Sequence, residues 1–283
     1  MEITVSDQKV FLIAPQVPFE SAREKAWDQK MAAFGTMSRL LLRPKADEIK
    51  VASIEKRFEP LWEVKAHKRI VFDRGREYRV PVGDATVQAV TVAGADYPAA
   101  AGPPRHFIVR GMEHCEDDVR LERLVDGLSG EEVTAPEVTA APREEITDLS
   151  TFAPADAIVV PPEVKASTVI QRIVTQLMTP YEADQVFEEG IEIEGLHMLY
   201  HPVYAFEYLW EARSKKAVVE FDAVTGKVNT DGRAFQQQMR RIFNRDVLFD
   251  VGGEAVNLVV PGGAIALKIG KAVVDHRKHQ KKP

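Results

Sequence analysis

Two stretches of the chain space their apolar residues three and four positions apart, which is the pattern of a helix with one apolar face. The first follows a capping-box sequence, Ser21 to Glu24, and its apolar positions are Trp27, Met31, Phe34, Met37 and Leu41. The second ends before Pro180, and its apolar positions are Val169, Ile170, Ile173, Val174 and Leu177. Both patterns predict helices that lie on a sheet or on another helix.

Short segments rich in β-branched and aromatic residues follow each helix and predict antiparallel strands. In the first half they are residues 49–54, 61–66, 69–72, 78–82 and 87–92, and in the second half residues 190–199, 203–210 and 217–221. The sequence from Asp73 to Arg76 is typical of a hairpin turn between two of these strands. The order of a helix followed by a meander of strands therefore occurs twice.

An aromatic-proline-aromatic pattern also occurs twice, at residues 58–62 and at residues 200–204. Each copy is followed by a strand that ends at an aspartate, Asp73 in the first copy and Asp222 in the second. This similarity indicates an architecture built by internal duplication.

Residues 125–130 and 221–226 resemble each other as well, because each places Asp at a strand end and Gly four residues later. Aspartate can cap a turn with its own carboxylate, and glycine can adopt the positive φ that a chain reversal requires. Both stretches are therefore predicted to be reverse turns with a structural role.

These patterns predict an α+β protein with two related halves, residues 1–142 and 143–232, each a helix packed on an antiparallel sheet. The boundary falls in residues 134–143, which are rich in Thr, Pro, Ala and Glu. Residues 233–283 are expected to form a C-terminal helical hairpin with a basic tail. We expect this hairpin to fold back on its own domain; the alternatives are that residues 251–282 contact an anionic membrane surface or pack into a partner.

Composition narrows the class of protein. A hydrophobic content of 45% with 28% charged residues is typical of a folded soluble chain. The net charge of −6 argues against a nucleic-acid partner, because phosphate binding requires clustered Lys and Arg. The single cysteine, Cys115, excludes an intramolecular disulfide, and the start of the chain lacks the pattern of a signal peptide. We therefore expect a cytoplasmic protein.

One segment of the second half resembles a known family. Tyr200, Pro202, Tyr204 and Phe206, followed by the strand and turn of residues 218–228, are similar to the strand-strand-turn portion of PepSY-like repeats. Those repeats are small α+β modules, usually found in bacterial cell-envelope or inhibitory contexts, and the similarity covers about residues 164–228. The whole chain also resembles an uncharacterised family of conserved bacterial proteins. These resemblances imply a bacterial binding or regulatory module and transfer no catalytic residue.

The sharpest candidate for metal chemistry is His106, His114 and Cys115, with the acidic residues 116–118 beside them. Imidazole, thiolate and carboxylate groups are ligands of zinc or iron. The alternative is an acidic, solvated turn beside a packed cysteine. His197 and His201, four residues apart, have no evident third ligand and are expected to have a structural place beside the aromatic strand.

Aromatic side chains are the candidates for binding a ligand or a partner, namely Trp62, Tyr200, Tyr204 and Phe206. Alternation along a strand gives the three residues of the second half the same face. That face is either the core beneath a helix or a groove that accepts a peptide or strand from a partner.

Together these observations favour a non-catalytic intracellular binding or scaffolding protein with a protein partner. A metal-dependent enzyme centred on the His/Cys cluster and a peripheral membrane protein using the C-terminal hairpin are the alternatives. The chain has no phosphate-binding loop of the GxxxxGK[ST] or GxGxxG type. An enzyme is therefore less expected than a binding protein.

Overall fold

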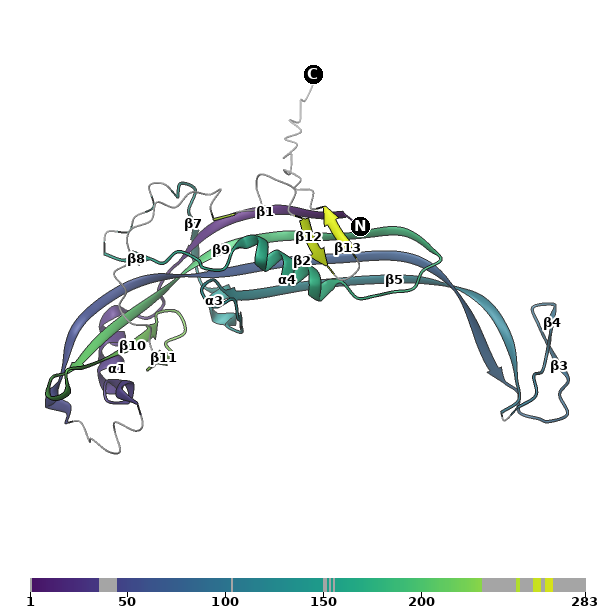
Figure 1. Cartoon of the computed structure of the whole chain (residues 1–283), viewed down its shortest axis with the longest axis horizontal. Helices are drawn as coiled ribbons and strands as arrows, with labels where there is room; N and C mark the ends of the chain where they lie inside the picture. Colours follow the sequence, from purple (N-terminus) through teal and green to yellow (C-terminus); the bar gives the residue numbers. More distant parts are fainter. Residues whose placement is uncertain are drawn as a thin grey trace, which may run out of the picture.

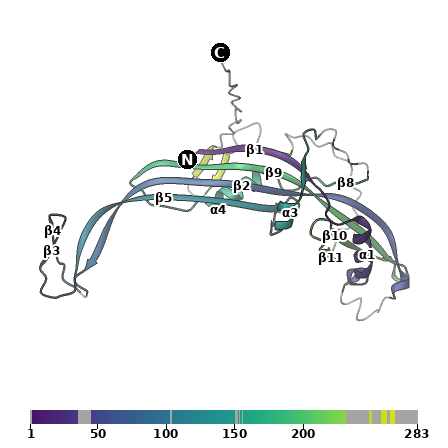
Figure 2. The same ribbon diagram turned by 180° about the vertical axis from the view of Figure 1, so that it is seen from behind.

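The computed structural model describes residues 2–35, 45–102, 104–149, 152, 154, 156–230, 248, 249, 257–260 and 263–266. Its main feature is one mixed sheet bent into an arch (Figures 1 and 2). Three long strands run along the arch: β2 (Ile49–Pro81), β5 (His106–Asp126) and β9 (Gln185–Trp210). β2 lies between the other two and pairs antiparallel with both.

Shorter strands complete this sheet, which contains nine strands within the described residues and has the order β11-β10-β9-β2-β5-β6 along its main path. β1 (Glu2–Ile13) pairs parallel with β9, β7 (Arg143–Glu145) pairs with β1, and β8 (Ile158–Val159) pairs parallel with β2. The remaining members are β6 (Glu132–Val133), β10 (Lys215–Asp222) and β11 (Val228–Asn229). A separate hairpin, β3 (Ala89–Val92) with β4 (Ala95–Pro98), lies at one end of the arch (Figure 1).

Two longer helices pack on the sheet. α4 (Ala166–Leu177) lies against β2 and β9, and all five residues of its predicted apolar stripe are buried, so that prediction is confirmed. α1 (Phe19–Gln29) packs on β9 and β10, and its buried residues are Ala22 and Ala26 rather than Trp27, which is 42% exposed. A third helix, α3 (Pro136–Ala140), is short.

The first predicted helix is wrong in its length. α1 ends at Gln29, and a 3-10 turn, η1 (Ala32–Phe34), follows it. Gly35 then has a φ of 82°, a conformation that glycine adopts without the strain it imposes on other residues, so the chain leaves the helical path there. Met37 and Leu41 lie outside the described residues. Two further 3-10 turns are η2 (Ala46–Glu48) and η3 (Glu211–Arg213).

The predicted α+β class, with two halves that each carry a helix on their own antiparallel sheet, is wrong. The chain is mostly sheet, and β2 of the first half pairs with β9 of the second, so both halves share one sheet that crosses the boundary expected near residue 142. The reason is that β2 and β9 offer each other a long row of backbone groups, and pairing satisfies these groups. α1 accordingly packs on strands from the second half.

The predicted C-terminal helical hairpin is also wrong. Two strands, β12 (Asn257–Val260) and β13 (Gly263–Ala266), form an antiparallel pair within residues 233–283. Valine and isoleucine favour strands, and the intervening Pro-Gly sequence opposes a continuous helix. The predicted amphipathic helix at Phe235, Met239, Ile242 and Phe243 and the basic tail lie outside the described residues.

Both predicted reverse turns are present, and they use the same hydrogen bonds. Asp126 Oδ1 accepts from the backbone N–H groups of Leu128 and Ser129 at 2.7 and 2.8 Å, and Asp222 Oδ1 accepts from those of Val224 and Thr225 at 2.8 and 2.9 Å. Gly130 and Gly226 have φ values of 76° and 73°. The predicted turn chemistry is therefore confirmed at both places.

Each turn is attached to one of the two repeated prolines. The Gly127 N–H donates to the Pro60 carbonyl at 2.8 Å, and the Ala223 N–H donates to the Pro202 carbonyl at 3.1 Å. Asp126, and not Asp73, is therefore the counterpart of Asp222. Asp73 lies inside β2, which continues through residues 73–76, so the predicted hairpin turn there is wrong.

The two repeated patterns face each other across the β2–β9 pair. Phe58 lies opposite Pro202, Glu59 opposite His201, and Pro60 opposite Tyr200. Glu59 and His201, which directly precede the two prolines, are therefore paired with each other across the two strands. Each proline also lies at a gap between two neighbouring strands. Pro60 of β2 lies between the part that pairs with β8 and the part that pairs with β5. Pro202 of β9 lies between the part that pairs with β1 and the part that pairs with β10. A residue without an N–H group fits such a gap, because no strand there needs its donor.

None of the helices within the described part of the chain combines the length and the apolar character needed to cross a bilayer.

Candidate functional site: a pocket at the centre of the sheet

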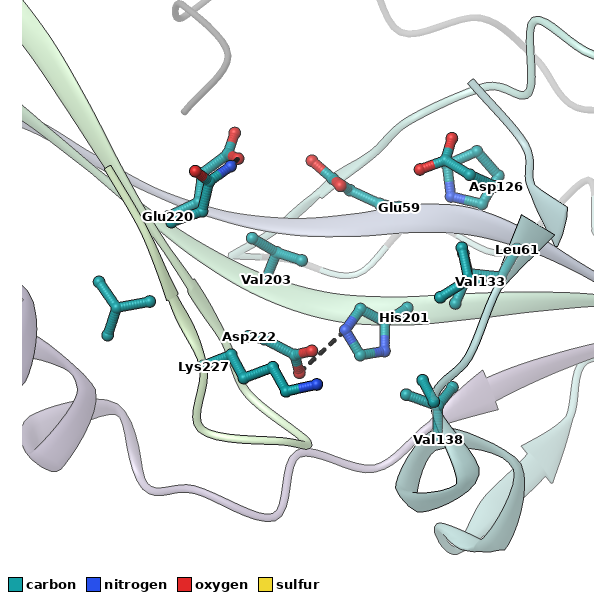
Figure 3. A pocket seen from close by; sticks show the side chains of 14 residues that line it. Glu59, Leu61, Asp126, Val133, Val138, His201, Val203, Glu220, Asp222 and Lys227 are labelled. Atoms are coloured by element: carbon teal, nitrogen blue, oxygen red, sulfur yellow. Dashed lines mark hydrogen bonds and ion pairs between the residues drawn. The ribbon is translucent and has the colours of Figure 1, made fainter. Parts of the chain in front are cut away.

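A pocket of about 410 Å³ lies where the two repeated patterns meet (Figure 3). The centre of the β2–β9 pair contributes Glu59 and His201, and each of the two Asp-capped turns contributes its aspartate, Asp126 and Asp222. The pocket therefore depends on segments from both halves of the chain, brought together by the shared sheet.

Strand alternation explains which side chains line the pocket. Residues two apart on a strand share a face, so Glu59 and Leu61 of β2 point to the same side, as do His201 and Val203 of β9. Even-numbered neighbours such as Trp62 and Tyr200 belong to the core that packs against α4. Residues of β6, α3, β10 and β11 and of the link between β6 and α3 complete the wall: Val133, Ala135, Val138, Glu220, Val228 and Asn229.

His201 and Asp222 form an ion pair that lines the pocket. His201 Nε2 lies 3.0 Å from Asp222 Oδ1, and the histidine side chain is only 9% exposed. Burial by itself would raise the pKa of Asp222, but the hydrogen bond and charge of His201 and the hydrogen bonds from Thr225 outweigh it and hold the pKa well below its usual range. Asp222 is therefore ionised at neutral pH and fixes the orientation of the imidazole ring.

The second ring nitrogen of His201, Nδ1, is also buried, and it has no hydrogen-bond partner among the described residues. A buried polar atom without a partner costs free energy, about 1 to 3 kcal/mol, so such atoms call for an explanation in the structure. Because His201 lines the pocket, a bound ligand could supply the missing hydrogen bond.

A second group of charges lies beside the pocket. The buried guanidinium of Arg57 donates from Nη1 to Glu220 Oε1 at 3.1 Å and from Nε to Glu55 Oε2 at 2.9 Å. Its Nη1 also lies 4.0 Å from Glu59 Oε1. Arg57 thus donates a hydrogen bond to one pocket carboxylate, Glu220, and lies within ion-pair distance of another, Glu59.

We expect Asp222 to stabilise the folded protein at neutral pH and to lose this effect in acid. Its pKa is about 3.9 in an unfolded chain and lower in the folded protein. The stabilisation is therefore complete above about pH 5 and declines as the pH falls towards the folded pKa. Urea unfolding of the wild type and of Asp222→Asn, which keeps an acceptor for the turn, should show a difference at pH 7 that narrows towards pH 3. A difference that stays constant over this range would contradict the assignment.

The four aromatic residues proposed for binding are core residues. Trp62, Tyr200 and Phe206 are 0% exposed, and Tyr204 is 8% exposed. Trp62 and Tyr200 belong to the cluster beneath α4, and Tyr204 and Phe206 to the cluster beneath α1. Their burial matches the core alternative.

The proposed metal ligands do not come together. His106 and His114 are eight residues apart on β5, which separates them by roughly 25 Å along an extended strand. The adjacent side chains of His114 and Cys115 point to opposite faces of that strand. His114 is 80% exposed, and its Nδ1 lies 2.7 Å from Asp73 Oδ1. Within the described residues, no group of three or more His, Cys, Asp or Glu is arranged to hold a metal ion.

The sequence motifs, taken one at a time, do not bring His201 together with its pocket partners. The proline pattern and the Asp-Gly turn are both present in the sequence, but a first copy that ends at Asp73 leaves Asp126 unconnected to Pro60. Joining Pro60 to Asp126 and Pro202 to Asp222 would have placed Glu59 and His201 at equivalent positions near two aspartates.

No protein-family model, no curated protein and no solved structure matches this chain. Its function is therefore inferred from the geometry of the pocket.

Proposed function

We propose that this is a non-catalytic binding protein whose ligand occupies the pocket between the two Asp-capped turns. The observation that carries the proposal is the buried Nδ1 atom of His201, which lines the pocket and has no hydrogen-bond partner in the described part of the chain. Asp222 holds the opposite side of the ring, so Nδ1 is presented in a fixed direction. A ligand that hydrogen-bonds to it would meet a site that is already formed.

The size and lining of the pocket support this proposal. Small-molecule sites have volumes of about 300 to 1,000 Å³ and combine apolar walls with a few polar groups. This pocket, at about 410 Å³, has walls that include Leu61, Val133, Val138 and Val203. The described residues that line it include no serine, threonine, cysteine or tyrosine, so the lining offers no hydroxyl or thiol for His201 to activate. This lining favours binding over covalent catalysis.

A proposed peripheral membrane role has a different basis from the pocket. It depends on residues 251–282, of which the structure describes only β12 and β13. These two strands lie near α4 and β1, on the body of the protein (Figure 1). The buried Nδ1 atom of His201 is the more specific observation, and it favours the pocket. We therefore place the ligand there.

Nuclear magnetic resonance of the imidazole nitrogens tests the proposal. A library of small polar fragments should contain members that shift the Nδ1 resonance of His201 while leaving that of His114, an exposed histidine on β5, unchanged. The same fragments should fail to bind Val203→Phe, which fills the pocket from its floor. If His201 does not respond to any fragment, or if Val203→Phe with an unchanged thermal midpoint binds as the wild type does, the proposal is wrong.

A further inference from the structure

The outer edge of β5 is a long row of backbone groups beside which no strand lies in the described part of the chain. β5 pairs with β2 along its whole length, and on its other side β6 reaches only Leu124 and Val125. At the opposite end of β5, an isolated bridge joins His106 to Ala100. Among the described residues, no strand pairs with this side of β5 between residues 108 and 120 (Figure 1). Such an edge is a template for a further strand, because its N–H and C=O groups point out of the sheet.

Backbone alternation shows which residues of β5 present these groups. The His106 carbonyl accepts from the Ala100 N–H at 2.7 Å, and at the other end of β5 the Asp126 N–H donates to the Glu131 carbonyl at 2.8 Å. Both partners lie on the side away from β2. The register of β5 on β2 is continuous, so the even-numbered residues between these two ends direct their N–H and C=O groups to the same side. A further strand would therefore bond to the even-numbered residues.

Exposed apolar side chains gather beside this edge. Ile108, Met112 and Val119 lie on β5, Tyr78 and Val80 lie on the part of β2 that pairs with it, and each of the five is at least 37% exposed. Apolar groups that gather on a surface in this way are a feature of interaction sites.

The sequence of β5 is complementary to itself when it runs antiparallel to a second copy with His114 opposite His114. This register places Arg110 opposite Asp118 and Val109 opposite Val119, and by symmetry each of these pairs occurs twice. Opposite charges and β-branched residues that face each other across two strands stabilise the pair. Between residues 108 and 120, the register brings no two acidic residues and no two arginines opposite each other.

Neighbouring registers lack this complementarity. A shift of one residue would bring the even-numbered residues, which point their backbone groups outward, opposite residues that point theirs towards β2. A shift of two residues in one direction puts Glu113 opposite Glu113 of the second copy, and a shift in the other direction puts Arg110 opposite Arg120. Like charges directly opposite each other are destabilising, so the charges of β5 select a single register.

The charges within each copy extend the alternation across the combined sheet. Arg110 Nε lies 2.9 Å from Glu77 Oε1 on β2, and Asp118 lies opposite Arg69 in the pairing of β5 with β2. One row of the combined sheet would therefore consist of Glu77 and Arg110 followed by Asp118 and Arg69 of the second copy, with negative and positive charges in turn. Arg110 and Asp118 each gain an opposite charge and keep the neighbour that they already have.

We propose that the protein forms a two-fold symmetric dimer through β5, in which residues 108–120 of the two copies pair antiparallel and His114 lies on the axis. The two arched sheets then become one continuous sheet, and the same surface is used by both copies. Asp73 Oδ1 lies 2.7 Å from His114 Nδ1, so a carboxylate flanks the central pair of imidazoles on each side.

Analytical ultracentrifugation of the full chain tests the dimer. The wild type should sediment at twice the monomer mass of 31.6 kDa. Arg110→Asp should raise the dissociation constant of the dimer about tenfold or more, because an aspartate then meets Asp118 at two equivalent places. The double variant Arg110→Asp with Asp118→Arg should restore dimerisation, since it exchanges the charges within each pair.

The matched control is Lys50→Glu, which changes the net charge by the same amount. Lys50 lies at the end of β2 that does not pair with β5, and like Arg110 it forms an exposed ion pair, with Glu211 at 2.9 Å. This variant should dimerise as the wild type does. Equal weakening by Lys50→Glu and Arg110→Asp, or a double variant no tighter than Arg110→Asp, would overturn the proposed pairing. A wild type that is monomeric at millimolar concentration would overturn the dimer and leave this edge to a different chain.

Cysteines introduced into a Cys115→Ser background test the register independently. His114→Cys places two thiols opposite each other on the axis, at a Cα separation of about 5.5 Å that a disulfide can span. Arg120→Cys lies on the same face of β5 but leaves roughly 40 Å between its two copies. Oxidised glutathione should link His114→Cys into a covalent dimer and leave Arg120→Cys unlinked on a denaturing gel. Any other result would place the contact elsewhere and overturn the proposal.

Discussion

Replacing Trp62 by alanine should lower the free energy of unfolding by about 3 to 5 kcal/mol, the usual cost of removing a fully buried aromatic side chain. Trp62 is 0% exposed and lies in the cluster that joins β2 and β9 to α4. Its Nε1 donates to the Val164 carbonyl at 2.9 Å, just before the start of α4, and its ring meets Phe249 edge-on at 5.7 Å. The substitution would leave a cavity and an unpaired carbonyl at the same place.

Urea unfolding measures this effect, and Trp62→Phe separates its two parts. Phenylalanine keeps most of the buried apolar area but cannot donate to Val164, so it should cost about 1 to 2 kcal/mol. Trp27→Ala is the control, because Trp27 is 42% exposed and should cost much less. A loss for Trp62→Ala no larger than that for Trp27→Ala would show that the α4 cluster does not stabilise the sheet as described.

Replacing Arg143 by methionine should destabilise the protein by about 3 kcal/mol, because it removes one partner of a buried carboxylate. Glu63 is 1% exposed, and its Oε2 accepts from Arg143 Nη1 at 2.9 Å and from His197 Nδ1 at 3.0 Å. Burial would raise the pKa of Glu63, but the hydrogen bonds from His197 and Arg143 and the charge of Arg143 outweigh it and lower the pKa. Without Arg143, the carboxylate keeps the hydrogen bond from His197 but loses the neighbouring guanidinium charge.

The double variant Arg143→Met with Glu63→Gln tests whether the cost comes from the buried charge. An amide at position 63 is neutral and retains the shape of the carboxyl group, so the double variant should be more stable than Arg143→Met alone. Chemical unfolding of the two single variants, the double variant and the wild type completes the cycle. If the double variant is as unstable as the sum of the two single variants, the charge explanation fails.

Local patterns in the sequence predicted the local structure well where one segment suffices to form it. The stripe of α4 is buried as expected, because five apolar residues at helical spacing give a helix only one way to lie on a sheet. The turns at Asp126 and Asp222 form with their own carboxylates and glycines, so their chemistry is contained in five residues.

Local sequence patterns did not predict the length of β2. Residues 73–76 contain a turn signal, yet the strand continues through them for five more positions to Pro81. Partners distant in the sequence hold this stretch extended: Arg74 Nε donates to Glu113 Oε2 at 2.5 Å, and the Gly75 N–H donates to Asp184 Oδ2 at 2.5 Å. A local turn preference is weaker than a continuous ladder of backbone hydrogen bonds.

The sequence by itself determined the α4 helix, the two Asp-capped turns and the presence of a repeated proline pattern, because each depends on residues close together along the chain. The tertiary structure alone decided that both halves share one sheet and that Glu59 lies opposite His201. It also decided that the predicted aromatic residues are core and that the pocket lies on the opposite face of the same strands. The physical reason is that strand register is set by pairing over long sequence separations, and a shift of one residue would exchange the two faces of the strand.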